Sequence, residues 1–269
     1  VGLQNLWIWC KISNNNMIIL DGKKTSNDIK AEIAEEVKQI KEAGNRPPHL
    51  AAVIVGSDGA SLTYVGSKVK ACKRVGYEST LIKLPEKTTE NELLNQVKQL
   101  NANDSIDGYI VQLPLPSHID AQTILMSINP DKDVDGFHPT NFGKMSLNLP
   151  TFISATPSGI IELLKRYKVQ TEGKNTVVIG RSDIVGKPIG ILMGLKTNPG
   201  NSTVTLAHSK TSNIKNLTLK ADIVISALGI PNFLKEDMVK EGVVVIDVGI
   251  TRVANNSEKG YKIVGDVDY

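Results

Sequence analysis

Cysteine, histidine and aromatic residues are all scarce in this chain of 269 residues. Its two cysteines, Cys10 and Cys72, are too few for a disulfide framework or a cysteine-based metal cluster. The four histidines stand singly, without a pair at metal-ligand spacing, so we expect no metal site. Aromatic residues contribute only 4%, which leaves Ile, Val, Leu and Ala to build the core.

Long apolar runs and a strong net charge are also lacking. No stretch of about 18 apolar residues is present, so we expect no membrane-spanning helix. A formal net charge of +3 gives no sign of the clustered basic face that is typical of nucleic-acid-binding domains. We therefore expect a globular protein with neither nucleic acid nor membrane as a partner.

From Met17 onward, apolar runs of strand length alternate with amphipathic helical stretches. Strands are expected at 17–22, 49–56, 79–85 and 106–116, with helices at 29–44, 61–75 and 88–103 between them. After a linking helix at 158–168, strands are expected at 174–182, 202–209, 221–229 and 242–249. This alternation predicts βαβ units and an α/β fold of two domains, the second a Rossmann-like parallel-sheet domain.

The domain limits follow from changes in the character of the sequence. Residues 117–157 are rich in proline and interrupt the alternation, so we place the boundary after Pro157. Residues 1–16 hold both tryptophans, and we expect an N-terminal extension outside the fold, with an extra strand as the alternative. The expected domains are therefore 17–157 and 158–269.

A glycine-punctuated turn follows the first strand of the second half. Gly180 allows a tight turn and Gly186 close helix–strand packing, as where a dinucleotide pyrophosphate meets a helix N-terminus, although an ordinary strand–turn–helix has the same pattern. Ser182 replaces the middle glycine of the motif. The next strand ends without the acidic residue that binds the NAD ribose, and Arg181 suits the extra phosphate of NADP. We therefore expect NADP as the cofactor. The alternative is that Arg181 and Lys210 are only charged side chains that face the solvent.

Two polar groupings stand out in the first half. Ser61, Tyr64 and Lys68 share one helix face, which suits acid/base chemistry, although the spacing alone favours an ordinary amphipathic helix. Gln112 lies in an apolar strand and needs a hydrogen-bond partner, which Lys68 could supply. The segment 130–136 lacks the glutamate of a calcium loop, so Asp135 either belongs to a capped turn or faces a ligand.

Eight segments occur together in the order typical of one family. Their residues are 61–68, 108–116, 130–137, 155–160, 178–188, 208–211, 221–229 and 245–251. From Met17 to Tyr269 the chain resembles bifunctional methylenetetrahydrofolate dehydrogenase/methenyltetrahydrofolate cyclohydrolase. The resemblance implies a cytoplasmic homodimer that acts on tetrahydrofolate derivatives in one-carbon metabolism and purine biosynthesis. It also implies a cleft between an N-terminal catalytic domain and the NADP-binding domain.

The resemblance implies roles for individual residues. Lys68 is the central acid/base group, Tyr64 orients the folate, Gln112 hydrogen-bonds Lys68, and Asp135 holds the pterin; these four form the catalytic set. Tyr64, Gln112 and Asp135 also bind substrate, together with Ser61, Leu113 and Pro114. The cofactor contacts are Gly180, Arg181, Ser182, Ser209 and Ile250.

One departure from the family pattern leaves alternatives open. The family continues past Tyr269 with a proline- and glycine-rich loop and a final helix, so we hypothesise a fragment that retains cofactor binding with impaired activity. A second alternative is another two-domain NADP-dependent dehydrogenase, which should lack the set Tyr64, Lys68 and Gln112. A third is a dinucleotide sensor without catalysis.

Overall fold

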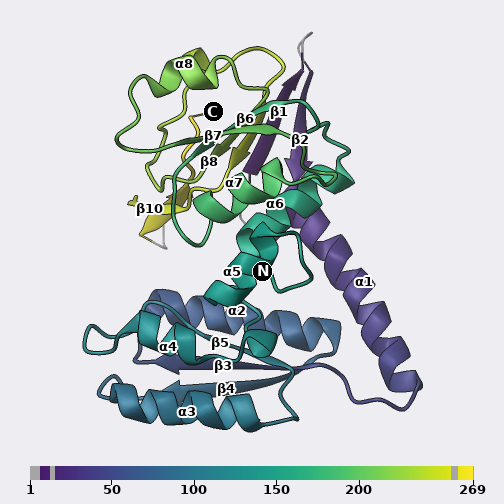
Figure 1. Ribbon diagram of the computed structural model, residues 1–269, viewed down its shortest axis with the longest axis vertical. Coiled ribbons are helices and arrows are strands. Elements are labelled where there is room, and N and C mark those ends of the chain that lie inside the picture. The colour runs from purple at the N-terminus through teal and green to yellow at the C-terminus, as the bar shows by residue number, and fades with distance from the viewer. Residues whose placement is uncertain (1–6, 13–15, 256–259, 269) are drawn as a thin grey trace. The chain divides into compact units, whose positions relative to one another are not determined.

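The computed structural model describes residues 7–12, 16–255 and 260–268 of a chain that forms two compact units (Figure 1). One unit is Asn27–Ser154, and the other combines Gly2–Ser26 with Ala155–Tyr269. The boundary at Ser154 lies close to the one expected after Pro157, but residues 17–26 join the second unit instead of the first. Two α/β units are thus present, as the alternation of strands and helices predicts.

The first unit is built on a parallel sheet with the strand order β4-β3-β5, made of β3 (His49–Val55), β4 (Glu78–Leu84) and β5 (Gly108–Val111). Its helical segments are α2 (Gly59–Val75), α3 (Glu90–Ala102), α4 (Ala121–Ser127), η2 (Pro130–Lys132) and α5 (Pro139–Ser146). Successive residues of β3 point to opposite faces. Val53 lies in the core with residues of α3 and α4, whereas Ile54 packs with Val65 of α2. Helices cover both faces, which explains why β3 is a continuous apolar run.

Helix α1 (Gly22–Glu42) begins earlier than the sequence suggests. We expected its cap within residues 25–28, but the Asp21 carboxylate accepts the N–H of Lys24 at 2.8 Å. The Thr25 hydroxyl also donates to the Asp21 carbonyl at 2.9 Å. A side-chain acceptor placed just before the first turn satisfies a free N–H group there, so the helix starts at Gly22.

Strand β5 ends at Val111, sooner than the expected 106–116. The N–H of Gln112 still donates to the carbonyl of Val53 at 2.9 Å, but Gln112 lies just after the strand instead of within it. Pro114 has no N–H to donate to a neighbouring strand, which prevents the ladder from continuing.

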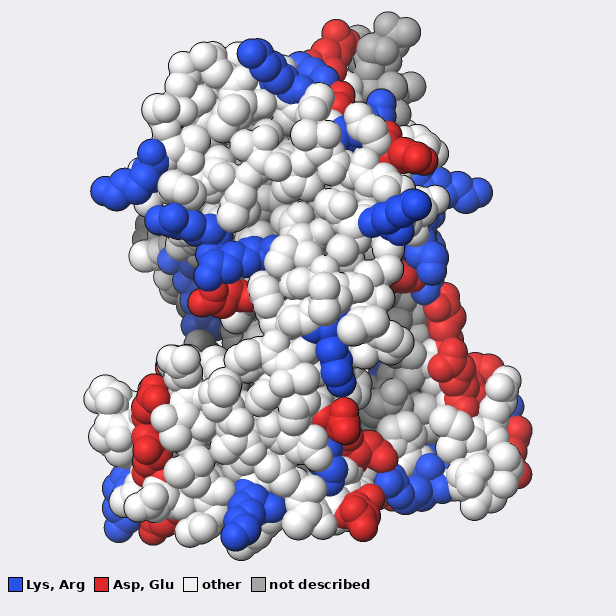
Figure 2. Space-filling view, in the orientation of Figure 1, with Lys and Arg blue, Asp and Glu red and all other residues white. Residues whose placement is uncertain are grey.

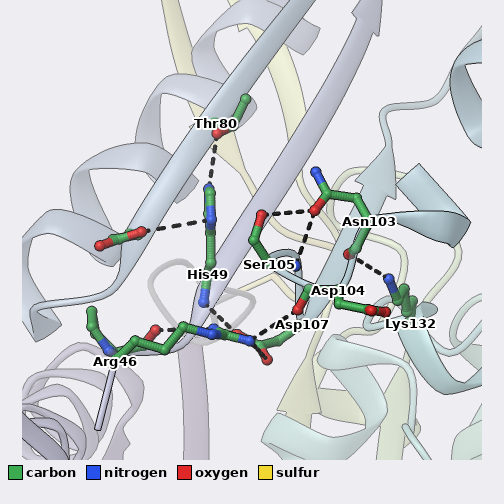
Figure 3. Close-up of polar contacts among 10 residues, drawn as sticks. Arg46, His49, Thr80, Asn103, Asp104, Ser105, Asp107 and Lys132 are labelled. Atoms are coloured by element: carbon green, nitrogen blue, oxygen red, sulfur yellow. Dashed lines mark hydrogen bonds and ion pairs between the residues drawn. The ribbon is translucent and has the colours of Figure 1, made fainter. Parts of the chain in front are cut away.

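A polar network ties together the amino ends of β3 and β5 (Figure 3). The guanidinium of Arg46 donates to both carboxylate oxygens of Asp107, at 2.7 and 2.8 Å. Asp107 also accepts the N–H of His49 at 2.8 Å. The hydrogen bond from Arg46, helped by that of His49, lowers the pKa of Asp107, so this carboxylate stays ionised and links the two strands.

The second unit has the strand order β2-β1-β9-β8-β6-β7. Its parallel part consists of β6 (Asn175–Ile179), β7 (Thr203–Ala207), β8 (Ile223–Ser226) and β9 (Val244–Asp247). The other elements are α6 (Ala155–Arg166), α7 (Gly186–Gly194), α8 (Ile214–Thr218), η3 (Glu236–Met238), β10 (Thr251–Ala254) and β11 (Tyr261–Val264). The chain crosses from β6 outward to β7 and then back to β8, so the strand order reverses beside β6.

Residues of the N-terminal extension take part in this sheet. β1 (Trp7–Ile12) pairs antiparallel with β2 (Asn16–Asp21) and with β9. We expected residues 1–16 to lie outside the fold, but residues 7–12 form the extra strand that was the alternative. β1 covers the backbone edge that β9 would otherwise expose, which is a common way to protect an edge strand.

The surface shows no single dominant charge on the face drawn in Figure 2, where basic and acidic side chains are interspersed with uncharged areas. This distribution agrees with the net charge of +3. Within the part of the chain that the structure describes, no helix is both long and apolar enough to cross a membrane.

Candidate functional site

Helix α2 carries three of the predicted residues on one side, as their spacing predicts. Its amino end is capped by Asp58, whose carboxylate accepts the N–H of Ser61 at 2.8 Å, and Ser61 is buried. One turn further, the ring of Tyr64 is 47% exposed. Val65 packs against the sheet and fixes the rotation of α2, so Tyr64 is available to a ligand.

Lys68 forms an ion pair with Asp135, from a segment 67 residues further along the chain. The distance between Lys68 Nζ and Asp135 Oδ1 is 3.4 Å, and the two side chains are 19% and 20% exposed. Burial raises the pKa of the Asp135 carboxyl, while the positive charge of Lys68 opposes this rise. The structure therefore places two titratable groups in contact in a partly desolvated position, which suits proton transfer.

A buried network holds the loop that presents Asp135. The Asp133 carboxylate is 2% exposed and accepts the N–H of His138 at 2.8 Å and the side-chain amide of Asn141 at 3.0 Å. Asn141 also donates to the carbonyl of Pro130 at 2.9 Å. The sequence analysis assigned no role to Asp133 or Asn141. The aspartates at alternate positions 131, 133 and 135 were the signal in this segment.

Gln112 has a different partner from the predicted one. Its amide nitrogen donates to the carbonyl of Leu113 at 2.6 Å, whereas the acidic partner of Lys68 is Asp135. The prediction that Lys68 satisfies Gln112 is therefore wrong for this structure, because the amide turns to the adjacent backbone where β5 ends. Gln112 and Leu113 are half-buried and Pro114 is exposed.

The glycine turn after β6 has the tight geometry that the sequence suggests. Gly180 is buried with φ +123°, and a Cβ there would collide with the backbone carbonyl of Ala227. A Cβ on Gly186, the first residue of α7, would collide with the backbone of Gly180 and Arg181. Both glycines are required because backbone segments approach one another closely at these points.

The other predicted cofactor residues lie on loops at the carboxyl ends of the parallel strands. The hydroxyl of Ser182 accepts the N–H groups of Val185 and Gly186 at 3.2 and 3.3 Å, which shapes the start of α7. Arg181 is exposed on the same turn, Ser209 is exposed after β7, and Ile250 is 40% exposed after β9. In open parallel sheets this edge is where dinucleotides bind. The close backbone turn and the exposed cation of Arg181 fit NADP.

The fold and these two sets of residues define a class of protein. A parallel-sheet unit with a dinucleotide turn accompanies an α/β unit that carries a paired lysine and aspartate. This combination defines a two-domain dinucleotide-dependent dehydrogenase.

Comparison with known proteins identifies the family. Residues 20–135 match the catalytic domain, and residues 154–269 the NAD(P)-binding domain, of tetrahydrofolate dehydrogenase/cyclohydrolase. The chain belongs to this family.

Curated relatives and solved structures agree with this assignment. The chain is 67% identical over 254 residues to the bifunctional protein FolD of Flavobacterium psychrophilum, covering 94% of this chain and 86% of that one. The crystal structure of the bifunctional enzyme FolD from Campylobacter jejuni is 48% identical, with a TM-score of 0.86 over 93% of this chain and 85% of that one. The Trypanosoma brucei enzyme, solved with NADP and an inhibitor, is 36% identical, with a TM-score of 0.84 over 91% of this chain and 83% of that one.

The activity follows from the family. The chain is an NADP-dependent enzyme that oxidises 5,10-methylenetetrahydrofolate to 5,10-methenyltetrahydrofolate and hydrolyses this product to 10-formyltetrahydrofolate. Another dehydrogenase class and a sensor without catalysis are not favoured by these matches.

Proposed function

We propose that the first unit carries the tetrahydrofolate chemistry through Lys68 and Asp135. The observation that supports this most directly is their ion pair, at 3.4 Å in a partly buried position. In hydrolysis, water adds to the methenyl carbon and loses one proton, which leaves a hydroxyl on that carbon. The hydroxyl then loses its own proton as the formyl C=O forms, so one proton is released overall, and the bond from the carbon to N5 breaks as N5 gains a proton. Lys68 Nζ passes this proton, while Asp135 hydrogen-bonds the amino and amide groups of the pterin.

We propose further substrate contacts around the pair of Lys68 and Asp135. Tyr64 lies about one helical turn from Lys68 and its exposed ring stacks along the folate. Gln112, whose amide donates to the carbonyl of Leu113, is a substrate contact in the proposal. The remaining substrate contacts are Ser61, Leu113 and Pro114.

The second unit binds NADP in the proposal, through Gly180, Arg181, Ser182, Ser209 and Ile250. When it is bound, NADP supplies the acceptor for the hydride. Gly180 lets the backbone approach the pyrophosphate, and the guanidinium of Arg181 pairs with the extra phosphate that distinguishes NADP from NAD. Since hydride transfer requires mainly correct positioning, no proton-transfer group is assigned to this unit.

The assembly, the location and the domain limits are also part of the proposal. The resemblance to the family favours a homodimer in the cytoplasm that serves purine biosynthesis. It also favours a folate domain at 17–157 and an NADP domain at 158–269, although residues 17–26 group with the second unit in this structure. Light scattering on the purified chain would test the dimer.

Asp135→Asn tests the role of the ion pair. The amide keeps the shape but loses the charge, so we expect kcat/KM for hydrolysis to fall about 10- to 100-fold, the size of a lost charged hydrogen bond. Burial raises the pKa of Asp135, so the wild-type carboxylate is protonated at a higher pH than an ordinary aspartate and activity declines on the acid side. This decline should disappear from the pH profile of the variant.

Asp131→Asn is the matched control, because Asp131 is exposed in the same loop. Its kinetics and pH profile should equal those of the wild type. Equal activity of Asp135→Asn and wild type at every pH would refute the proposed role of Asp135.

A further inference from the structure

Two buried carboxylates, neither of them a predicted cofactor contact, lie at the carboxyl end of the second unit's sheet. Asp247 is the last residue of β9 and is 1% exposed, and Asp266 follows β11 and is fully buried. A buried carboxylate persists only where hydrogen-bond donors compensate for the loss of water. The donors around each one therefore show what it holds in place.

The donors to Asp266 are Ser226, the last residue of β8, and the backbone of the loop that follows it. Its Oδ2 accepts the N–H of Leu228 at 2.7 Å, the N–H of Gly229 at 3.3 Å and the hydroxyl of Ser226 at 3.3 Å. Its Oδ1 accepts the N–H of Ile230 at 2.9 Å. An ionised carboxylate accepts hydrogen bonds and donates none, so it matches this set of donors.

Asp247 in turn holds the segment that carries Asp266. Its Oδ1 accepts the N–H of Asp266 at 2.9 Å and that of Gly249 at 3.1 Å, and its Oδ2 accepts the N–H of Val267 at 3.2 Å. A Cβ on Gly249 would collide with the Asp266 carboxylate. The end of β9 thus fixes Asp266, and Asp266 fixes the loop after β8.

This loop forms one wall of the dinucleotide turn. The N–H of Ala227 donates to the carbonyl of Ile179 at 2.8 Å, and the carbonyl of Ala227 fills the space where Gly180 would carry a Cβ. The strand order reverses between these neighbouring strands, which is the position where ligands of such sheets bind. A shift of residues 227–230 would therefore change the shape of the cofactor site.

We propose that Asp266 is a positioning residue for NADP. Its carboxylate gathers the N–H groups of residues 228–230 inward and so fixes the backbone against which the dinucleotide lies, without contact between Asp266 and the cofactor. This inference rests on the proposed placement of NADP at the turn after β6. The hydrolysis step needs no dinucleotide. A change at Asp266 should therefore affect oxidation and leave hydrolysis intact.

The test is Asp266→Asn in the full chain, with isothermal titration of NADP and separate assays of oxidation and hydrolysis. The amide presents N–H groups to donors that need an acceptor, so the loop shifts. We expect the Kd and KM for NADP to rise at least about tenfold, which corresponds to about 1.4 kcal/mol. Hydrolysis of methenyltetrahydrofolate should stay within about twofold of the wild type, a difference of about 0.4 kcal/mol.

Asp222→Asn is the control at the amino ends of the same parallel strands, because Asp222 directly precedes β8. Asp222 also accepts a backbone N–H, that of Asn175 at 2.8 Å, and it pairs with Lys240 at 2.7 Å. Its loss should leave the Kd for NADP unchanged. An equal loss of NADP affinity in both variants would show a general loosening of the sheet and would overturn the inference.

Ser226→Ala is a milder variant that tests the inference if Asp266→Asn does not fold. It removes one donor to Asp266 and leaves the carboxylate, so we expect a smaller rise in Kd in the same direction. Circular dichroism and thermal unfolding identify a variant that fails to fold. Unchanged NADP affinity in folded Asp266→Asn, or in Ser226→Ala where Asp266→Asn does not fold, would refute the inference while leaving the proposed function intact. If the wild type binds no NADP, the proposed function itself fails.

Discussion

Lys68→Met will abolish hydrolysis of methenyltetrahydrofolate while NADP still binds with the wild-type affinity. Methionine is also long and unbranched, but it has no group that can carry a proton. Loss of a general acid/base group costs about 10²- to 10⁴-fold in rate, so we expect hydrolysis to fall by at least 10²-fold. Hydrolysis is followed by the disappearance of the methenyl compound, and NADP binding by titration calorimetry.

The partner of Lys68 makes a second consequence measurable. Without the ammonium group, Asp135 keeps the burial that raises its pKa and loses the charge that opposes this rise. The carboxyl in Lys68→Met should therefore take up its proton at a higher pH than in the wild type, which carbon-detected NMR can follow.

Lys70→Met is the control for the first prediction. Lys70 lies on the exposed side of α2, so its loss should change neither activity. Near-normal hydrolysis by Lys68→Met would contradict the proposed mechanism, whereas loss of NADP binding in this variant would mean that the substitution acts beyond its own site.

Gly180→Ala will remove NADP binding and oxidation together while leaving hydrolysis. The added Cβ would meet the backbone carbonyl of Ala227, which cannot rotate away as a side chain can. The φ of +123° is also unfavourable for alanine. We expect the Kd for NADP to rise at least about 100-fold, equal to about 2.8 kcal/mol, and the free energy of unfolding to fall by about 1–3 kcal/mol.

Gly190→Ala provides a matched glycine substitution in the same unit. Gly190 lies within α7, and a Cβ there would make only ordinary contact with Leu206 Cδ1, at 3.7 Å. Alanine favours helix by about 1 kcal/mol relative to glycine, so this variant should be as stable as the wild type or more stable. Similar NADP affinity in Gly180→Ala and Gly190→Ala would show that the turn after β6 does not receive the dinucleotide.

The order of the helices and strands could be predicted because it depends on local patterns. Apolar runs such as that of β3 predict buried strands. The helices expected at 61–75 and 88–103 correspond to α2, which is capped at its end by Gly76, and to α3, which is capped at its start by Thr89. The errors lie where an unforeseen contact decides the outcome. Asp21 starts α1 early, and β1 pairs with β9, which lies more than 200 residues away in the sequence.

The structure brings some of the predicted site residues together, and it differs from the sequence interpretation in how they pair. The sequence places Tyr64 and Lys68 on one helix face, but it cannot show that Asp135 approaches Lys68 from a distant loop. The partner assigned to Gln112 was wrong, because a nearby backbone carbonyl satisfies its amide. Which of two possible hydrogen-bond partners a side chain takes depends on where its strand ends. The spacing of residues in the sequence does not determine that point.

Asp266 shows why some functional candidates are missed altogether. An aspartate is normally taken to be solvated, since aspartate is rarely buried without a partner. Its burial depends on donors from residues 226–230, which only the folded sheet brings together. The sequence analysis expected no strand at 261–264, so β11, which ends two residues before Asp266, gave no signal either.

This chain oxidises methylenetetrahydrofolate with reduction of NADP and then hydrolyses the methenyl product. The most direct measurement is a spectrophotometric assay of the purified chain with 5,10-methylenetetrahydrofolate and NADP, then with NAD. We expect the methenyl compound to form faster with NADP than with NAD and then to decay to 10-formyltetrahydrofolate. Failure to form the methenyl compound with either dinucleotide, by a folded chain that binds NADP, would contradict the account.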